Sequence, residues 1–241
     1  WFGQGYLFGS GGIGGDNDFI IVGDDSAGTD SSFTNPNSGQ AVIFNRATGA
    51  TVRVLNSPTA ADSNTYARLS KFGKGVDITE FNGYKYACIG APAHRNASDQ
   101  LVPRIYVYKS NDGFSTITLV KTIELSEYTA ISTNNTLFRG RKTFKAKGKW
   151  LIVGDYAYNS TGLCKYYDIT DELYDYDYTA NVMDDWTGWS VGTNGTKFVY
   201  SDPLKDGLYA GGSITPPNEG KIAMFEHNGS YFTREGYQIV G

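Results

Sequence analysis

The sequence predicts an all-β fold made of four repeated four-stranded antiparallel sheets, each about 60 residues long. Three observations predict it. One hairpin pattern recurs four times in the 241 residues, alternating strands follow each copy in the same order, and almost no stretch has an apolar period of about 3.6 residues. The 30 glycines and 18 tyrosines are typical of a chain with many turns and half-buried strand positions.

The recurring hairpin has a turn with Gly or Asx-Gly, an apolar run and a small residue that ends the run. Its four copies are GGDNDFIIVGD, FNGYKYACIGA, AKGKWLIVGD and TNGTKFVYSD, which end at Asp24, Ala91, Asp155 and Asp202. Asn82-Gly83 and Asn194-Gly195 suit a two-residue type I′ turn, which needs a positive φ at both central positions. Lys147-Gly148 is a weaker version of that turn, and residues 15–18 form a longer loop.

A polar loop and a third, alternating strand follow each hairpin. The third strands are predicted at 39–45, 104–110, 163–169 and 220–227. Their closing aromatic residues lie 64, 59 and 58 residues apart, at Phe44, Tyr108, Tyr167 and Phe225. A fourth strand completes each unit, at 50–56, 118–125, 174–179 and 231–240.

Four-stranded units in tandem predict a β-propeller, because one sheet cannot cover both of its apolar faces alone and radial stacking covers each with a neighbour. The second strands, such as 19–22 and 151–153, are continuously apolar, as expected of a strand buried on both faces. Gly23, Gly90 and Gly154 would let the backbone turn sharply where blades crowd. A β-sandwich would explain the alternation but not the fourfold recurrence.

We therefore expect a single propeller domain over residues 1–241, with repeats at about 1–56, 57–126, 127–185 and 186–241. The blades would form a closed four-bladed ring, part of a larger propeller, or an open array that a neighbouring chain completes. In a closed ring, the strand at 237–240 would pair with residues 6–8. A start at Trp1 without Met is expected of a processed product or a segment of a longer protein.

The second repeat resembles an FG-GAP repeat of the integrin α-subunit propeller type. The resemblance rests on Phe72-Gly73, the hairpin, Ile89-Gly90-Ala91-Pro92 and the strand at 104–108, and the other three copies match in part. It implies a propeller that binds other molecules, often at a cell surface. In that family, a carboxylate-rich loop in some blades holds calcium, whereas the turns at 82–83, 147–148 and 194–195 lack acidic ligands.

A bound Ca²⁺ is left open, since this ion takes about six to eight oxygen ligands and acidic residues cluster in the first repeat and again in the third. Only Asp16-Asn17-Asp18 is similar to the family loop, and the metal candidates are Asp16, Asp18 and Asp24. The alternative is that these carboxylates cap solvated turns. No other cofactor is expected.

No catalytic residue is assigned. The two histidines are His94 and His227, and His94 is expected in an exposed loop after the Gly-Ala-Pro break. The chain has no Gly-x-Ser-x-Gly, His-Glu-x-x-His or phosphate-binding loop. The enzymatic alternative is a propeller-fold glycoside hydrolase, which would need two carboxylates roughly 5–9.5 Å apart.

Recognition is expected in loops such as those at 25–39, 92–103, 155–162 and 203–219, because loops on a rigid scaffold commonly carry it. Aromatic side chains beside polar ones suit sugar faces and protein surfaces. The ligand-binding candidates are Trp186, Trp189, His94, Arg95, Tyr156 and Tyr158. Packing of Trp186 and Trp189 between blades is the alternative.

The charge and hydropathy of the chain argue against two kinds of partner, nucleic acid and the membrane interior. A net charge of −4 offers no basic stripe for nucleic acid, and no apolar run reaches the roughly 18 residues that membrane insertion needs. We predict a non-enzymatic binding or structural protein, extracellular or on a virion surface, whose partners are a glycan, a protein ligand, or other virion or appendage subunits.

Cys88 and Cys164 are predicted to be small buried hydrophobes, with a disulfide between them left open.

Overall fold

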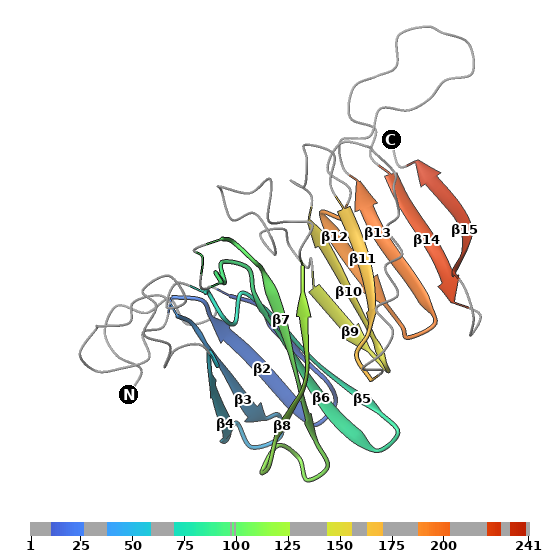
Figure 1. Ribbon diagram of the computed structural model, residues 1–241. Coiled ribbons are helices and arrows are strands. Elements are labelled where there is room, and N and C mark those ends of the chain that lie inside the picture. The colour runs from blue at the N-terminus through green and yellow to red at the C-terminus, as the bar shows by residue number, and fades with distance from the viewer. Residues whose placement is uncertain are drawn as a thin grey trace, which may run out of the picture. The chain divides into compact units, whose positions relative to one another are not determined.

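The computed structural model describes residues 11–26, 38–58, 70–96, 98, 100–125, 144–155, 163–170, 188–202, 221–227 and 232–239. All regular structure in these ranges is β-strand, in four antiparallel sheets, which confirms the all-β prediction (Figure 1). No helix within them could span a membrane. The chain divides into two compact units, Trp1–Asn135 (unit 1) and Thr136–Gly241 (unit 2).

Unit 1 holds two four-stranded sheets in which each strand pairs with the next along the chain. The first sheet contains β1 (Ile13–Gly15), β2 (Phe19–Asp24), β3 (Gln40–Asn45) and β4 (Thr51–Asn56). The second contains β5 (Gly75–Phe81), β6 (Tyr84–Ala91), β7 (Arg104–Ser110) and β8 (Thr118–Glu124).

Unit 2 repeats this plan. Its first sheet contains β9 (Phe144–Lys147), β10 (Trp150–Asp155) and β11 (Leu163–Asp168). Its second contains β12 (Ser190–Thr193), β13 (Lys197–Asp202), β14 (Lys221–His227) and β15 (Phe232–Ile239). The predicted strand at 174–179 lies outside the described residues, as do residues 6–8, so ring closure stays a prediction.

The predicted second, third and fourth strands lie where the alternation placed them, wherever the structure describes them. The predicted hairpins imply a first strand before each turn, which was given no bounds, and the structure supplies it as β1, β5, β9 and β12. In the first hairpin, a glycine-rich segment forms β1, which pairs Ile13 with Val22 and Gly15 with Ile20.

The hairpin turns confirm one prediction and correct two. Asn82 and Gly83 have φ values of 49° and 77°, as a type I′ turn requires. At the fourth hairpin, the loop between β12 and β13 has three residues, and only Gly195 has a positive φ, so the predicted two-residue turn is wrong. The Asn194 carboxamide oxygen accepts from the Thr196 and Lys197 amides, which stabilises the longer loop. At the third hairpin, the turn residues are Gly148-Lys149, and Lys147 still belongs to β9.

Among the described residues, each unit has a hydrophobic core with side chains from both of its sheets. In unit 1, β5 contacts β1 and β2, and the core contains Ile21, Ile43, Ile78, Ile89 and Tyr106. In unit 2, β12 contacts β9 and β10. That core is more aromatic, and its buried members include Trp150, Tyr166, Phe198, Tyr200 and Phe225. Burial of apolar side chains between the two sheets of each unit agrees with the packing of neighbouring sheets that the repeat predicts.

A glycine at the end of a second strand lets the next sheet approach closely in both units. A Cβ added to Gly23 would lie 1.8 Å from the Gly73 carbonyl oxygen, and one added to Gly154 would lie 2.3 Å from the Gly188 carbonyl oxygen. Gly73 in turn donates its amide to Gly90 O, and Gly188 donates to Ser201 O. These glycines were predicted to allow a sharp turn, and the structure shows that Gly23 and Gly154 make room for neighbouring backbone.

Cys88 and Cys164 are free and fully buried, one in each unit, which confirms their prediction as small core residues. Burial raises the pKa of the Cys88 thiol and raises that of Cys164 to about 12. Because the thiolate is the reactive form, we expect neither thiol to react with a disulfide reagent at neutral pH until its unit unfolds. Mass spectrometry of the labelled peptides at increasing urea checks this, and labelling of the native chain would contradict it.

Candidate functional site

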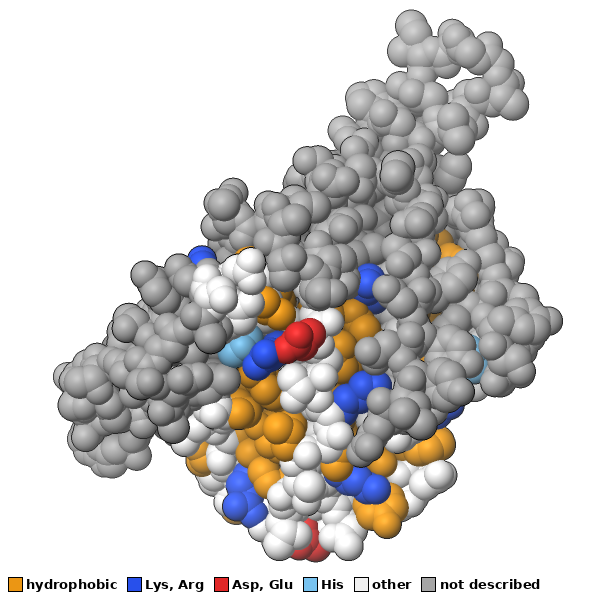
Figure 2. All heavy atoms as spheres, in the orientation of Figure 1, with side chains coloured by type: hydrophobic (Ala, Val, Ile, Leu, Met, Phe, Trp, Pro, Cys, Tyr) orange, Lys and Arg blue, Asp and Glu red, His pale blue; other side chains and the backbone are white. Residues whose placement is uncertain are grey.

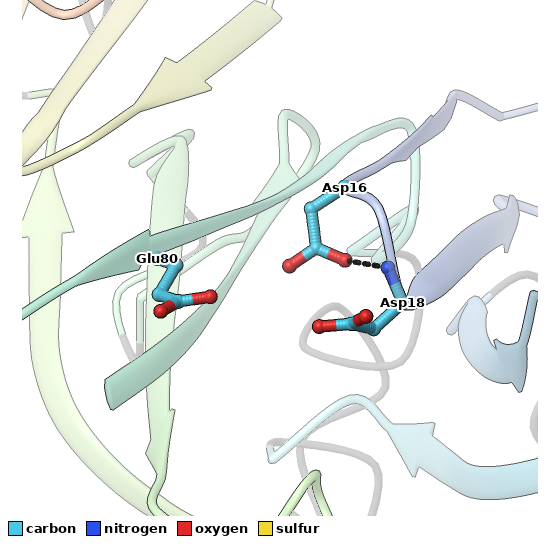
Figure 3. A group of neighbouring side chains, drawn as sticks. All are labelled: Asp16, Asp18 and Glu80. Atoms are coloured by element: carbon cyan, nitrogen blue, oxygen red, sulfur yellow. Dashed lines mark hydrogen bonds between the residues drawn. The ribbon is translucent and has the colours of Figure 1, made fainter. Parts of the chain in front are cut away.

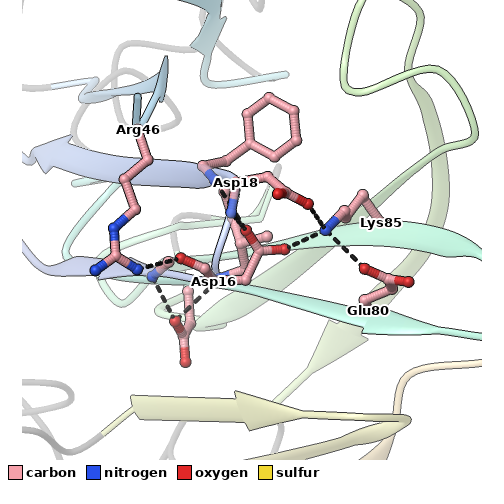
Figure 4. Close-up of polar contacts among 9 residues, drawn as sticks. Asp16, Asp18, Arg46, Glu80 and Lys85 are labelled. Carbon is pink, nitrogen blue, oxygen red and sulfur yellow. Dashed lines mark hydrogen bonds and ion pairs between the residues drawn. The ribbon is translucent and has the colours of Figure 1, made fainter. Parts of the chain in front are cut away.

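Three carboxylates of unit 1, Asp16, Asp18 and Glu80, converge on the ammonium group of Lys85 (Figure 4). Lys85 Nζ lies 2.8 Å from Asp16 Oδ2, 2.7 Å from Asp18 Oδ2 and 2.7 Å from Glu80 Oε2. Asp16 and Asp18 come from the loop between β1 and β2, whereas Glu80 and Lys85 come from the hairpin of β5 and β6. We call the three acids the acidic triad.

Local hydrogen bonds fix the first two acids. Asp16 Oδ1 accepts from the Asp18 and Phe19 amides, at 2.9 Å each, so this carboxylate holds its own loop (Figure 3). Arg46 supports the same loop from the end of β3, because its Nη1 donates to Asp16 O and its amide donates to Asp18 O.

The second pair is fixed by strand register. The two-residue turn at Asn82-Gly83 pairs Phe81 with Tyr84 and therefore Glu80 with Lys85. Cross-strand neighbours on one face lie about 4.5–5.5 Å apart at Cβ, which brings a glutamate and a lysine within contact. The Lys85 side chain is 14% exposed, whereas those of Asp18 and Glu80 are 61% and 55% exposed.

The ion network shifts two pKa values. Burial acts to raise the pKa of Asp16, but the bond from Lys85 and the two backbone amides outweigh burial and hold that pKa below its usual value. Burial acts to lower the pKa of Lys85, but its bonds to the three acids outweigh burial and raise that pKa. Asp16 and Lys85 are therefore both charged at neutral pH.

Chemically, the acidic triad is a cation site that the chain fills with its own lysine. The acid oxygens lie within 4.8 Å of one another, a spacing that would suit a metal ion. Lys85 Nζ is within hydrogen-bonding distance of all three, so a metal would have to displace it.

Because the acids come from two sheets, the network joins these sheets. The Asp77 carboxylate does the same beside it, since Oδ1 accepts from the Gly15 amide of β1 at 3.0 Å.

The structure brings together two of the three predicted metal candidates. Asp16 and Asp18 belong to the acidic triad, but Asp24 lies at the opposite end of β2. Asp24 is buried and accepts from the Ser26 amide at 3.0 Å. Its neighbour Asp25 is paired with Lys74 at 3.1 Å.

The predicted loop candidates are not gathered into one site among the described residues. His94 was expected to be exposed and is only 3% exposed, because its amide and carbonyl bond to Ala91 O and the Val102 amide and fold the loop back. Arg95 is half-buried and bridges to Leu101. Trp189 is half-buried next to β12. Trp186, Tyr156 and Tyr158 lie outside the described residues.

Unit 2 has a comparable lysine–carboxylate contact at a hairpin turn. Lys149 Nζ lies 2.7 Å from Asp168 Oδ2, and Asp168 Oδ1 accepts from the amide and hydroxyl of Thr170. The His227 ring lies 4.6 Å from the Trp150 ring, centroid to centroid. Burial, and then the charge of Lys149, lower the pKa of His227, so this histidine is neutral at neutral pH.

Comparisons with known proteins identify no family. No protein-family model matches the chain, and no curated protein sequence matches it. Among solved structures, the fold is similar to a GH32 β-fructofuranosidase from Bombyx mori, with 12% identity and a TM-score of 0.40. The match covers 97% of this chain and 51% of that protein, so the chain spans about half the length of the enzyme.

Proposed function

We propose that the chain is a non-enzymatic recognition module of the β-propeller type, which binds a glycan or protein ligand at a cell or virion surface. One observation carries this proposal. The acidic cluster that sequence and structure bring together is closed by Lys85 and joins two sheets, so it acts as part of the scaffold.

Sheet topology supports the placement of the ligand site. Within each sheet, the connection between the second and third strands leaves the same strand end, after Asp24, Ala91, Asp155 or Asp202. Rigid sheets that hold variable loops at one end are a common platform for recognition. The resemblance to FG-GAP repeats points to the same role.

Surface charge favours a glycan or protein over nucleic acid. On the face shown in Figure 2, the described lysine and arginine side chains are scattered among hydrophobic and uncharged ones and do not merge into a continuous basic area. A nucleic-acid interface would present its basic residues on one face or along one groove.

The alternative is a glycoside hydrolase that uses a pair of carboxylates. Such an enzyme needs one carboxylic acid that is protonated before reaction and a second carboxylate that attacks or activates water. Asp16 does not suit the acid, because Lys85 and two amides hold its pKa low and its charge in place. Asp18 and Glu80 share the same lysine.

A glycan array run beside a hydrolysis assay tests the proposal. We expect binding without turnover, and binding unchanged in Glu80→Gln, because Glu80 belongs to the scaffold. Glu124→Gln, which removes a similarly exposed carboxylate that pairs with Arg104 outside the triad, is the matched control for loss of one charge. Hydrolysis of a bound glycan that Asp16→Asn or Glu80→Gln abolishes and Glu124→Gln preserves would overturn the proposal in favour of the glycosidase.

A further inference from the structure

A separate pocket of about 300 Å³ lies where β6 begins and the connection from β7 to β8 turns. It is lined by Tyr84, Lys109, Ser110, Asn111, Thr116, Thr118 and Val120. Because the loop at 92–103 follows the other end of β6, this pocket is distinct from the loops of the proposed function. Its volume is at the low end of the range of about 300–1,000 Å³ for small-molecule sites, which suits one sugar ring.

Lys109 provides the charge of the pocket. Strand pairing places it between Tyr86 and Thr118, and its Nζ lies 3.7 Å from the centroid of the Tyr84 ring and 5.9 Å from that of Tyr86. Among the residues that the structure describes, no carboxylate pairs with Lys109. A cation over an aromatic face keeps N–H donors that face away from the ring, and these can bind an anion.

Two polar side chains that line the pocket with Lys109 are also available to a ligand. The side chains of Asn111 and Thr118 are exposed, and in the described part of the chain neither has a hydrogen-bond partner. Tyr84 is 37% exposed, so part of the tyrosine also remains open to a ligand. An amide and a hydroxyl each donate and accept, which matches the hydroxyl groups of a sugar.

Asp112, the acid in the same connection, is turned toward its own loop. Its Oδ1 accepts from the Ser110 hydroxyl at 2.9 Å, and its Oδ2 accepts from the Thr116 hydroxyl at 2.6 Å. Ser110 and Thr116 therefore hold the loop in shape, and Lys109, Asn111 and Thr118 are left for a ligand.

We propose that this pocket binds an acidic saccharide through a ring that carries a carboxylate. The carboxylate pairs with Lys109, the ring hydroxyls bond to Asn111 and Thr118, and the apolar face of the ring packs beside Tyr84 and Val120. A lysine–carboxylate contact with a hydrogen bond is among the stronger polar contacts, and it weakens as salt screens the charges.

Isothermal titration of the full chain with a short oligogalacturonate, and with the same oligosaccharide methyl-esterified, tests the proposal. We expect the acid form to bind and the neutral ester to bind at least about tenfold more weakly, as charge-assisted hydrogen bonds imply. Lys109→Met should weaken binding of the acid form by a similar factor, and Lys109→Arg should restore most of it. Lys147→Met, an exposed lysine at the end of β9, is the matched control and should bind like the parent.

Three results would overturn the proposal: no binding of the acid form, equal binding of acid and ester, or unchanged binding in Lys109→Met. The melting temperature of each variant shows whether it is folded, and Thr118→Val provides a second, uncharged test of the same pocket. Binding to loop ligands on the glycan array should not change in Lys109→Met, so failure of this site is distinguishable from failure of the proposed function.

Discussion

Gly23→Ala is expected to destabilise unit 1 by about 3 kcal/mol or more, at or above the upper end of the usual cost of overpacking. The added Cβ would lie 1.8 Å from Gly73 O and 2.7 Å from Gly73 C. Both atoms are backbone, so no side chain can rotate away, and the two sheets would have to separate. Urea unfolding followed by labelling of Cys88 measures the effect in unit 1, while Cys164 reports unit 2.

Two further variants show whether close approach of the sheets is the cause. Gly192→Ala places its Cβ 3.2 Å from the tip of Val199 alone, which can yield, so we expect only a small change. Gly154→Ala should destabilise unit 2 as Gly23→Ala destabilises unit 1, since its Cβ would meet Gly188 O at 2.3 Å. A Gly23→Ala chain that unfolds within about 0.5 kcal/mol of its parent, the usual spread for surface changes, would refute this account.

Most strands were predictable because alternation and recurrence are properties of the chain itself. The third strands were located by their closing aromatics, and Asn82-Gly83 identified its turn. The bounds of β1 were not predicted, since its Ile-Gly-Gly sequence has one apolar residue and shows no period. At Asn194-Gly195, a side-chain bond from Asn194 to Lys197 stabilises a longer loop than the dipeptide alone suggests.

The sequence alone identified only some residues of the candidate site. Asp16 and Asp18 were identified from their loop, but Asp24 was grouped with them by sequence distance, although it is the last residue of the six-residue strand β2 that begins after that loop. Glu80 and Lys85 were missed, yet the predicted two-residue turn already implies that they face each other. That Lys85 reaches the first sheet depends on how the sheets pack, which no local pattern contains. The burial of His94 likewise depends on tertiary hydrogen bonds.

Lys85→Met is expected to lower the free energy of unfolding of unit 1 by about 2 kcal/mol, because it leaves a largely buried carboxylate without its cation. Asp16, whose side chain is 13% exposed, accounts for most of this loss. Asp18 and Glu80 contribute less, since water screens exposed pairs. Urea unfolding read at Cys88 measures the loss, and Lys147→Met, which removes an exposed lysine of unit 2, should change little.

The same variant should change how stability depends on pH. The folded-state pKa of Asp16 lies below its ordinary value of 3.8, so the unfolded chain binds more protons as the solution is acidified. The stabilisation from Asp16 is therefore complete above that ordinary value and is lost as pH falls through the folded pKa. Lys85→Met removes the bond that holds the pKa down, so its stability should fall less between neutral pH and acid than that of the parent.

A double-mutant cycle distinguishes the energy of the ion pair between Lys85 and Asp16 from the effect of removing the Lys85 side chain. If Lys85 acts through Asp16, then Lys85→Met combined with Asp16→Asn should cost less than the sum of the single changes, with a coupling of at least about 0.5 kcal/mol. The coupling should decrease toward zero at a pH below the folded pKa of Asp16, where the carboxyl is neutral in both states. Additive effects at neutral pH would show instead that the pair with Asp16 contributes nothing measurable, and that Lys85 stabilises unit 1 by other contacts, such as the one with the Phe19 ring at 5.7 Å.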